Sequence, residues 1–181
     1  MDHGLKNHPM ITTLKTAEYW REQLQLQPHV EGGAFRETYR SSWVLHKSTL
    51  PPGMKGNRNA ATCIYFLLEA GQFSAFHRIM ADEIWHFYDG EPLNIYEIGS
   101  DGRLTVHKLG RNLHLGEQLQ VIVTAGNWFA SRLDTDAGFA LVGCSVAPGF
   151  DFEDFELAQR KKLQALYPQH KELIFSLTRE D

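Results

Sequence analysis

Gly71 and Gly90 flank a stretch of the chain that contains a histidine and a glutamate close together. His77 and Glu83 stand on two short runs that are typical of neighbouring strands. Successive side chains of a strand point to opposite faces, so His77 shares a face with Ile79. On the next strand Glu83 shares a face with Trp85 and Phe87. In a small barrel, an imidazole and a carboxylate would therefore face one aromatic-lined interior.

This pair suits proton transfer on a small ligand. A histidine with an ordinary pKa of about 6.5 exchanges protons at neutral pH. A buried carboxylate is costly unless it is paired, hydrogen-bonded or used. Glu83 therefore indicates a polar ligand, an acid of raised pKa or a structural ion pair with Arg36 or Arg78. We predict His77 and Glu83 as catalytic residues; the structural alternative for His77 is a core histidine held by a hydrogen bond.

A polar strand predicted at residues 34–41 offers ligand-binding groups in Arg36, Tyr39 and Arg40. Arg36 and Arg40 have the same parity, and arginines of this kind bind phosphate or carboxylate bidentately. A salt bridge at a dimer interface is the alternative. Aromatic residues would form either a ligand-stacking wall or part of the core. These aromatic candidates are Trp85, Phe87, Trp128 and Phe129.

A metal site made of His77, Glu83 and His86 is a weaker alternative. Glu83 and His86 differ by three positions along one strand, so they point to opposite faces unless a bulge intervenes. We therefore predict a site without metal or other cofactor. The remaining histidines with no supporting spacing are interpreted as surface or loop residues: His29, His46, His107, His114 and His170.

The bulk properties favour one globular domain with a small-molecule ligand. The 181 residues are 43% hydrophobic, and the net charge of −4 with no basic run argues against a nucleic-acid partner. No apolar stretch approaches the roughly 18 residues that cross a membrane. The beginning of the chain does not resemble a signal peptide, which together with two unpaired cysteines predicts a cytoplasmic protein. We expect a tail at residues 1–15 and a single domain at 16–181.

The pattern along the chain predicts an all-β fold with helices at both ends. A helix is expected at residues 16–27 and a loop, as a candidate lid, at 49–59. Turn signals then separate short apolar runs at a spacing of about ten residues, which is typical of a sandwich or barrel. Two C-terminal helices are expected, at 155–166 and 171–177. The predicted strands are 62–68, 73–79, 83–88, 93–98, 104–109, 118–124, 128–133 and 139–146.

The stretch that holds His77 and Glu83 resembles the first motif of the cupin superfamily. That motif reads Gly, five residues, His-x-His, three or four residues, Glu, six residues, Gly, and here Ile79 replaces its second histidine. A second motif is similar to residues 116–133, where Phe129 stands at the motif's histidine. In metal-binding cupins these three histidines and the glutamate are the ligands. The resemblance thus implies that two of four donors are replaced by apolar groups.

A wider resemblance covers about residues 16–178. The segments that carry it are HVEGGAFRETYRS, TCIYFLL, FHRIMADEIWHFYDG, AGNWFASRL and VGCSVAPGFDFEDFELA. They are similar to a cupin group of unknown function, sometimes called the fifth cupin group, although Val30 replaces the proline usual in its His-Pro-Glu-Gly-Gly. The resemblance implies a jelly-roll barrel (a double-stranded β-helix) and a homodimer whose N-terminal strands pair across subunits. It implies no established reaction.

Three functions are compatible with these residues and are kept as hypotheses. The first is a metal-free cupin that binds a small polar ligand, sugar-like or carboxylate-bearing, and acts as an epimerase or isomerase through His77 and Glu83. The second is a metal-dependent oxygenase or hydrolase. The third is a non-catalytic ligand-binding or storage-like cupin.

Overall fold

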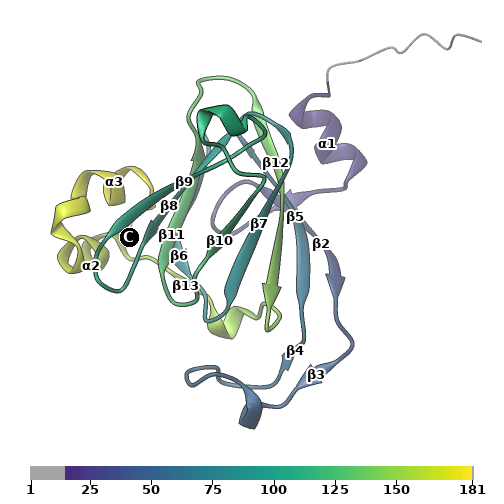
Figure 1. Ribbon diagram of the computed structural model, residues 1–181, viewed down its shortest axis with the longest axis vertical. Helices are drawn as coiled ribbons and strands as arrows, with labels where there is room; N and C mark the ends of the chain where they lie inside the picture. The colour runs from purple at the N-terminus through teal and green to yellow at the C-terminus, as the bar shows by residue number, and fades with distance from the viewer. Residues whose placement is uncertain (1–14, 181) are drawn as a thin grey trace, which may run out of the picture.

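Two antiparallel sheets face each other in a computed structural model, which describes residues 15–180 (Figure 1). The six-stranded sheet has the order β1-β2-β5-β12-β7-β10, and the five-stranded sheet has the order β13-β6-β11-β8-β9. This is the predicted all-β jelly roll. The tail predicted at 1–15 lies outside the described residues apart from Lys15. The strands of the two sheets are β1 Gln27–Pro28, β2 Ala34–Arg40, β5 Thr62–Glu69, β6 Phe73–Arg78, β7 Asp82–Gly90, β8 Leu93–Ile98, β9 Leu104–Leu109, β10 Gln120–Val123, β11 Trp128–Leu133, β12 Phe139–Ala147 and β13 Glu156–Leu157.

The core lies between the two sheets and follows the two-residue alternation of the sequence. Along β7, Glu83 and Trp85 are buried, whereas His86 lies on the outer side of the sheet. This confirms the predicted opposite orientation of Glu83 and His86. A second apolar cluster fills the space between the outer face of the five-stranded sheet and helices α2 (Arg160–Leu166) and α3 (Lys171–Ser176).

The N-terminal helix α1 spans Ala17–Gln23, which is shorter than predicted. Its start is as expected, since the Thr16 hydroxyl accepts the Tyr19 backbone N–H at 3.1 Å. The helix ends early because Gln25 adopts a positive φ of 51°, and β1 begins two residues later.

The C-terminal helix predicted at 155–166 is wrong in its first five residues, 155–159. Residues Phe152–Asp154 form a short 3₁₀ turn, β13 comes next, and α2 begins only at Arg160. Leu157 pairs with His77 across β6, and the Ala158 N–H donates to the Phe76 carbonyl at 2.8 Å. This segment therefore becomes a strand because it pairs with the free edge of β6. The pattern of apolar residues in the segment does not reveal that pairing.

A bulge at Thr38 changes which side chains of β2 face the barrel. In the pairing of β2 with β5, Glu37 lies opposite Ile64 and Tyr39 lies opposite Cys63, so Thr38 has no partner of its own. The extra residue reverses the parity of the later positions in the strand. The expectation that Arg36 and Arg40 share a face is therefore wrong.

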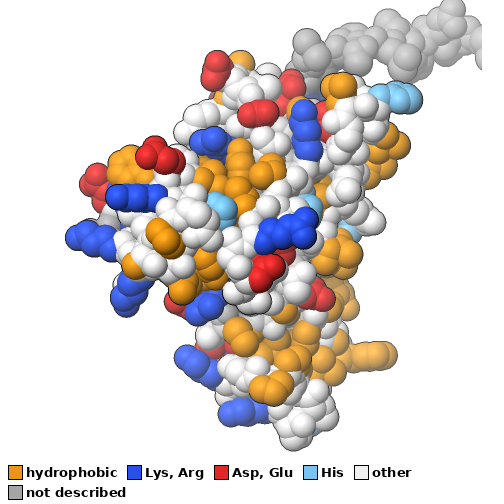
Figure 2. Space-filling model, turned by 60° about the vertical axis from the view of Figure 1, so that its left-hand side comes forward, with side chains coloured by type: hydrophobic (Ala, Val, Ile, Leu, Met, Phe, Trp, Pro, Cys, Tyr) orange, Lys and Arg blue, Asp and Glu red, His pale blue; other side chains and the backbone are white. Residues whose placement is uncertain are grey.

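The loop predicted at 49–59 is part of a hairpin that projects from the barrel (Figure 1). Its strands are β3 (Val44–Leu45) and β4 (Arg58–Asn59), with a 3₁₀ turn at Lys47–Thr49 between them. Trp43, next to this hairpin, is 79% exposed. Figure 2 shows hydrophobic side chains gathered in the lower part of the molecule, the part that holds the hairpin. Charges of both signs cover the face of the C-terminal helices.

Candidate active site

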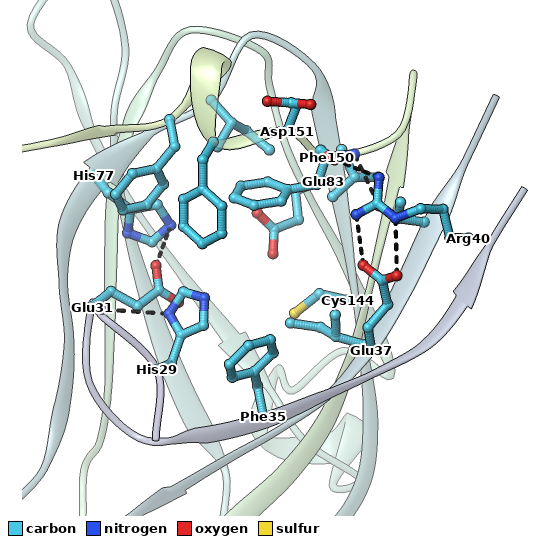
Figure 3. Close-up of a pocket in the computed structure, with 16 residues that line it drawn as sticks. His29, Glu31, Phe35, Glu37, Arg40, His77, Glu83, Cys144, Phe150 and Asp151 are labelled. Carbon is cyan, nitrogen blue, oxygen red and sulfur yellow. Dashed lines mark hydrogen bonds and ion pairs between the residues drawn. The ribbon is translucent and has the colours of Figure 1, made fainter. Parts of the chain in front are cut away.

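A cavity of about 280 Å³ opens into the barrel interior. Its walls come from β2, β5, β6, β7 and β12, from the turn before β2 and from the segment after β12. Figure 3 shows Glu31 and His77 on one side, Glu37 and Arg40 on the other, and the Glu83 carboxylate directed into the space between. The polar side chains of the cavity are those of His29, Glu31, Glu37, Arg40, Thr62, His77, Glu83, Cys144 and Asp151.

His77 is held by two acceptors in the barrel wall. Its Nδ1 lies 2.7 Å from the Ala75 carbonyl oxygen and its Nε2 lies 2.9 Å from Glu31 Oε2. Burial alone would lower the pKa of His77, but the charge of the Glu31 carboxylate and its hydrogen bond raise it overall. Burial likewise acts to raise the pKa of Glu31, and the charge and hydrogen bond of His77 lower it overall. The pair is thus a buried imidazolium and carboxylate, and no nitrogen lone pair of His77 is left to take a proton.

Two glycines bring Glu31 to this position. Gly32 has a φ of 122°, and a Cβ there would collide with the Phe73 carbonyl oxygen. Gly33 has a φ of 69° and closely approaches the Leu67 carbonyl. The Glu31 carbonyl accepts the Ala75 N–H at 2.9 Å. The double glycine therefore lets the chain pack against β6, which inserts the Glu31 side chain into the barrel.

Glu83 is the ionisable group of the cavity with the most unusual environment. Its residue is 8% exposed, and its side-chain partner is the thiol of Cys144. Burial raises the pKa of Glu83 to about 7; the charge of His77 and the thiol hydrogen bond oppose this rise, and the charge of Glu31 adds to it. Burial and the nearby Glu83 carboxyl also raise the pKa of Cys144. A neutral thiol thus lies beside a carboxyl group that gains and loses its proton near neutral pH.

His29 adds a second imidazole to the same wall. Its Nδ1 lies 3.5 Å from Glu31 Oε1, and its side chain is 9% exposed. Burial lowers the pKa of His29; the Glu31 charge opposes this and the His77 charge adds to it. His29 is therefore the neutral histidine of the site, beside the charged His77.

The arginine at the mouth of the cavity is already engaged. Arg40 donates from Nε and Nη2 to the two oxygens of Glu37, at 2.9 and 2.6 Å. Its Nη1 donates to Asn59 Oδ1 and to the Phe150 carbonyl oxygen, both at 3.1 Å. Of its five N–H groups, only one is left for a ligand.

The roof of the cavity is the segment after β12, and the β3–β4 hairpin anchors it. Arg58 of β4 donates from Nε and Nη2 to the two carboxylate oxygens of Asp154, at 2.6 and 2.8 Å. The Gly149 N–H donates to the Asn59 carbonyl at 2.8 Å. These bonds hold Phe150, whose ring closes the cavity opposite Phe35 (Figure 3).

The residues predicted for ligand binding divide into two groups. Arg40 lines the cavity together with the two predicted catalytic residues. Arg36 and Tyr39 do not: Arg36 alternates with Phe35 and Glu37, which line the cavity, and the Thr38 bulge turns Tyr39 away in favour of Arg40. Sequence reasoning missed Glu31 and took His29 for a surface residue. The remaining predicted side chains are core residues behind the cavity wall rather than lining it: Trp85, Phe87 and Phe129.

The donors that metal-binding cupins use are not assembled here. Phe129 packs on His77 with ring centroids 4.1 Å apart, Ile79 lines the cavity, and both His77 nitrogens are engaged. The alternative ligand His86 bonds Ser145 and Gln120 on the outer side of the sheet. Within residues 15–180, no group of three His, Cys, Asp or Glu side chains is arranged to hold a metal ion. The residues present therefore do not fit the metal of other cupins.

The topology and the position of the cavity define a cupin. The chain belongs to the family described as "Cupin superfamily (DUF985)", whose model matches residues 18–158. The uncharacterized protein YML079W of Saccharomyces cerevisiae is 35% identical over 140 residues, which are 72% of this chain and 69% of that protein.

Solved structures agree with this assignment. Protein SO0799 from Shewanella oneidensis is 42% identical with a TM-score of 0.83, covering 93% of this chain and all of that one. A hypothetical protein from Leishmania major is 35% identical with a TM-score of 0.82, covering 91% and 99%. An oxalate decarboxylase mutant of Bacillus subtilis, at 15% identity and a TM-score of 0.51 over 86% of this chain and 38% of that one, shares the fold alone.

Proposed function

We propose that the barrel binds a small, hydroxyl-rich, sugar-like compound without a metal and moves a proton on it as an isomerase or epimerase. The observation that supports this is Glu83, a buried carboxyl group directed into the cavity with a pKa raised to about 7. General acids and bases work best when their pKa is close to the working pH. A carboxyl group in this environment gives up and takes back a proton without large cost.

The geometry supports a different division of roles between the two predicted residues. Proton abstraction needs a free lone pair, and both nitrogens of His77 face acceptors. We therefore assign the proton transfer to Glu83. His77, fixed by Glu31, supplies a buried positive charge that stabilises negative charge developing on the substrate.

The cavity favours the sugar-like ligand over the carboxylate-bearing one. An anion would need the Arg40 guanidinium, which Glu37 already binds through both of its oxygens. Hydroxyl groups, by contrast, can donate to Glu83 and accept from it as its protonation changes. The volume of about 280 Å³ lies just below the roughly 300–1,000 Å³ of drug-sized sites, which favours a single sugar unit.

Deuterium exchange tests this proposal without knowledge of the product. The protein is incubated in D₂O with a panel of aldoses and ketoses, and NMR records deuterium at the carbon next to the carbonyl. We expect exchange with at least one sugar, its loss in Glu83→Gln, and its retention in the control Glu22→Gln on the exposed side of α1. Exchange that survives Glu83→Gln would contradict the assignment. Binding without any exchange would favour the non-catalytic cupin.

We also propose the homodimer that the family resemblance implies. The hairpin region supports it, since Trp43 and Val44 are 79% and 52% exposed, and exposed apolar groups of this kind mark contact surfaces. Light scattering of the full chain should give twice the monomer mass.

Free thiols at Cys63 and Cys144 agree with the expected cytoplasmic location. Among residues 15–180 there is no helix with the length and apolar character to cross a membrane.

A further inference from the structure

The cavity carries an excess of negative charge once its ion pairs are counted. Glu31 pairs with His77, and Glu37 pairs with Arg40, so each of these pairs is neutral. His29 adds no charge near neutral pH because burial lowers its pKa. Two carboxyl groups that line the cavity have no cationic partner in this count. They are Glu83 and Asp151.

The Glu83 carboxyl group points into the cavity and has few hydrogen-bonding or charged partners. It is 8% exposed and forms no ion pair within the described part of the chain, where its side-chain partner is a thiol, a weak donor. A buried carboxylate in this state is costly, and an incoming cation would remove the cost. The carboxylate thus favours a positively charged group in the cavity over a neutral or negative one.

Asp151 continues this negative charge to the mouth of the cavity. Its Oδ1 accepts the Glu153 backbone N–H at 2.9 Å, and it forms no ion pair of its own among residues 15–180, although the charges of Arg40 and Arg58 act on it from a distance. The nearby Arg58 is bound to Asp154 and Glu153. The roof therefore contributes an unpaired carboxylate where a ligand enters.

The roof also presents a cluster of aromatic rings. Phe150 and Phe152 have ring centroids 5.0 Å apart, and Phe155 lies 6.2 and 6.0 Å from them. All three line the cavity, and Phe35 faces them from β2. The faces of aromatic rings attract cations, most strongly where water is excluded. Unpaired carboxylates beside such rings form a combination that recognises ammonium groups.

We propose that the ligand of this barrel is a small hydroxylated amine whose ammonium group binds against Phe150 and Phe155 within reach of Glu83, with Asp151 attracting it at the mouth. This inference rests on the proposed function and specifies its substrate class as aminosugar-like. Arg40 contributes no anion site, because Glu37 occupies it. The same charge distribution disfavours sugar nucleotides and sugar acids.

A triplet of ligands on one carbon skeleton tests the charge directly. Glucamine, sorbitol and gluconate carry an ammonium, a hydroxyl and a carboxylate group on the same polyhydroxylated chain, and related triplets extend the panel. Calorimetry and thermal shift at pH 7.5 compare their binding to the full-length protein. We expect the amine of a triplet to bind roughly tenfold tighter than its alcohol, from the attraction of rings and carboxylates, and the acid to bind most weakly.

Variants assign the preference to its residues. Glu83→Gln and Asp151→Asn should each reduce the ratio of amine to alcohol affinity several-fold. Asp136→Asn, the same change at an exposed acid of the β11–β12 turn, should leave the ratio unchanged. If the alcohol of each triplet binds best, the charge assignment is overturned and the proposed function stands. If the acid binds best, the charge assignment and the preference for a neutral sugar-like ligand are both overturned. If no triplet binds in any form, both are overturned. A preference for amines that persists in both variants would likewise overturn the assignment to this cavity.

Discussion

Replacing Glu83 by glutamine should make the protein more stable at alkaline pH and leave it nearly unchanged at acid pH. The native state holds the Glu83 proton up to about pH 7, whereas the unfolded chain releases it at about 4.5. Between these values unfolding releases a proton, so the free energy of unfolding of the natural protein falls as pH rises. Glutamine keeps the shape and carries no proton to lose.

The size of the effect is set by the pKa. A rise from 4.5 to about 7 corresponds to roughly 3 kcal/mol, at about 1.4 kcal/mol for each pKa unit. Urea denaturation at several pH values between 5 and 8.5, monitored by tryptophan fluorescence, gives the free energy of unfolding of both proteins. The difference between them should be below about 1 kcal/mol at pH 5 and grow to about 3 kcal/mol in favour of the variant above pH 8.

The control for this measurement is Glu22→Gln, whose difference from the natural protein should not change with pH. A stability difference for Glu83→Gln that is flat across the range would refute the inference that Glu83 is buried without a charged partner. A difference that grows in the opposite direction would mean that the carboxylate is stabilised in the native state. Glu83 would then not be a proton donor near neutral pH.

Three further changes probe the surroundings of the site. Glu31→Gln leaves the buried imidazolium unpaired and should cost about 3 kcal/mol between pH 4.5 and 6.5, where both partners are charged; because the pKa of the histidine is raised, the loss should shrink as pH rises through that raised value. Gly32→Ala should lower the free energy of unfolding by more than about 1 kcal/mol, seen as a lower melting temperature, since its φ of 122° and a carbonyl of β6 exclude a Cβ; an unchanged melting curve would show that the turn is not held as described. Asp154→Asn should cost about 1–3 kcal/mol in urea titrations because Arg58, with a side chain only 2% exposed, loses a charged acceptor; equal midpoints would show that the roof is anchored elsewhere.

Much of the barrel could be predicted from the sequence because strands are a local pattern. All eight runs predicted between residues 62 and 146 are strands, and alternation alone placed Glu83 inside and His86 outside. The resemblance in motif register pointed to His77 and Glu83, which do line one cavity.

The other parts of the site depend on contacts between distant segments. The bulge at Thr38 is set by pairing with β5, so the parity of Arg36 and Arg40 cannot be read along β2 alone. Glu31 reaches His77 from a turn, and its spacing from the strand carries no periodic signal. The segment HVEGG was the available clue, because two glycines after a carboxylate indicate a close backbone approach.

The roof of this barrel is held from two sides, by the hairpin and by the strands of the cavity wall. Arg58 and Asn59 bind it at the base of the hairpin, whereas the Thr62 hydroxyl of β5 accepts the Phe150 N–H at 2.9 Å. Beyond Phe155 the chain joins β6, where Leu157 pairs with His77. A change in the roof is therefore transmitted to the strand that carries the buried imidazole, so that entry of a ligand and the chemistry of the wall are mechanically coupled.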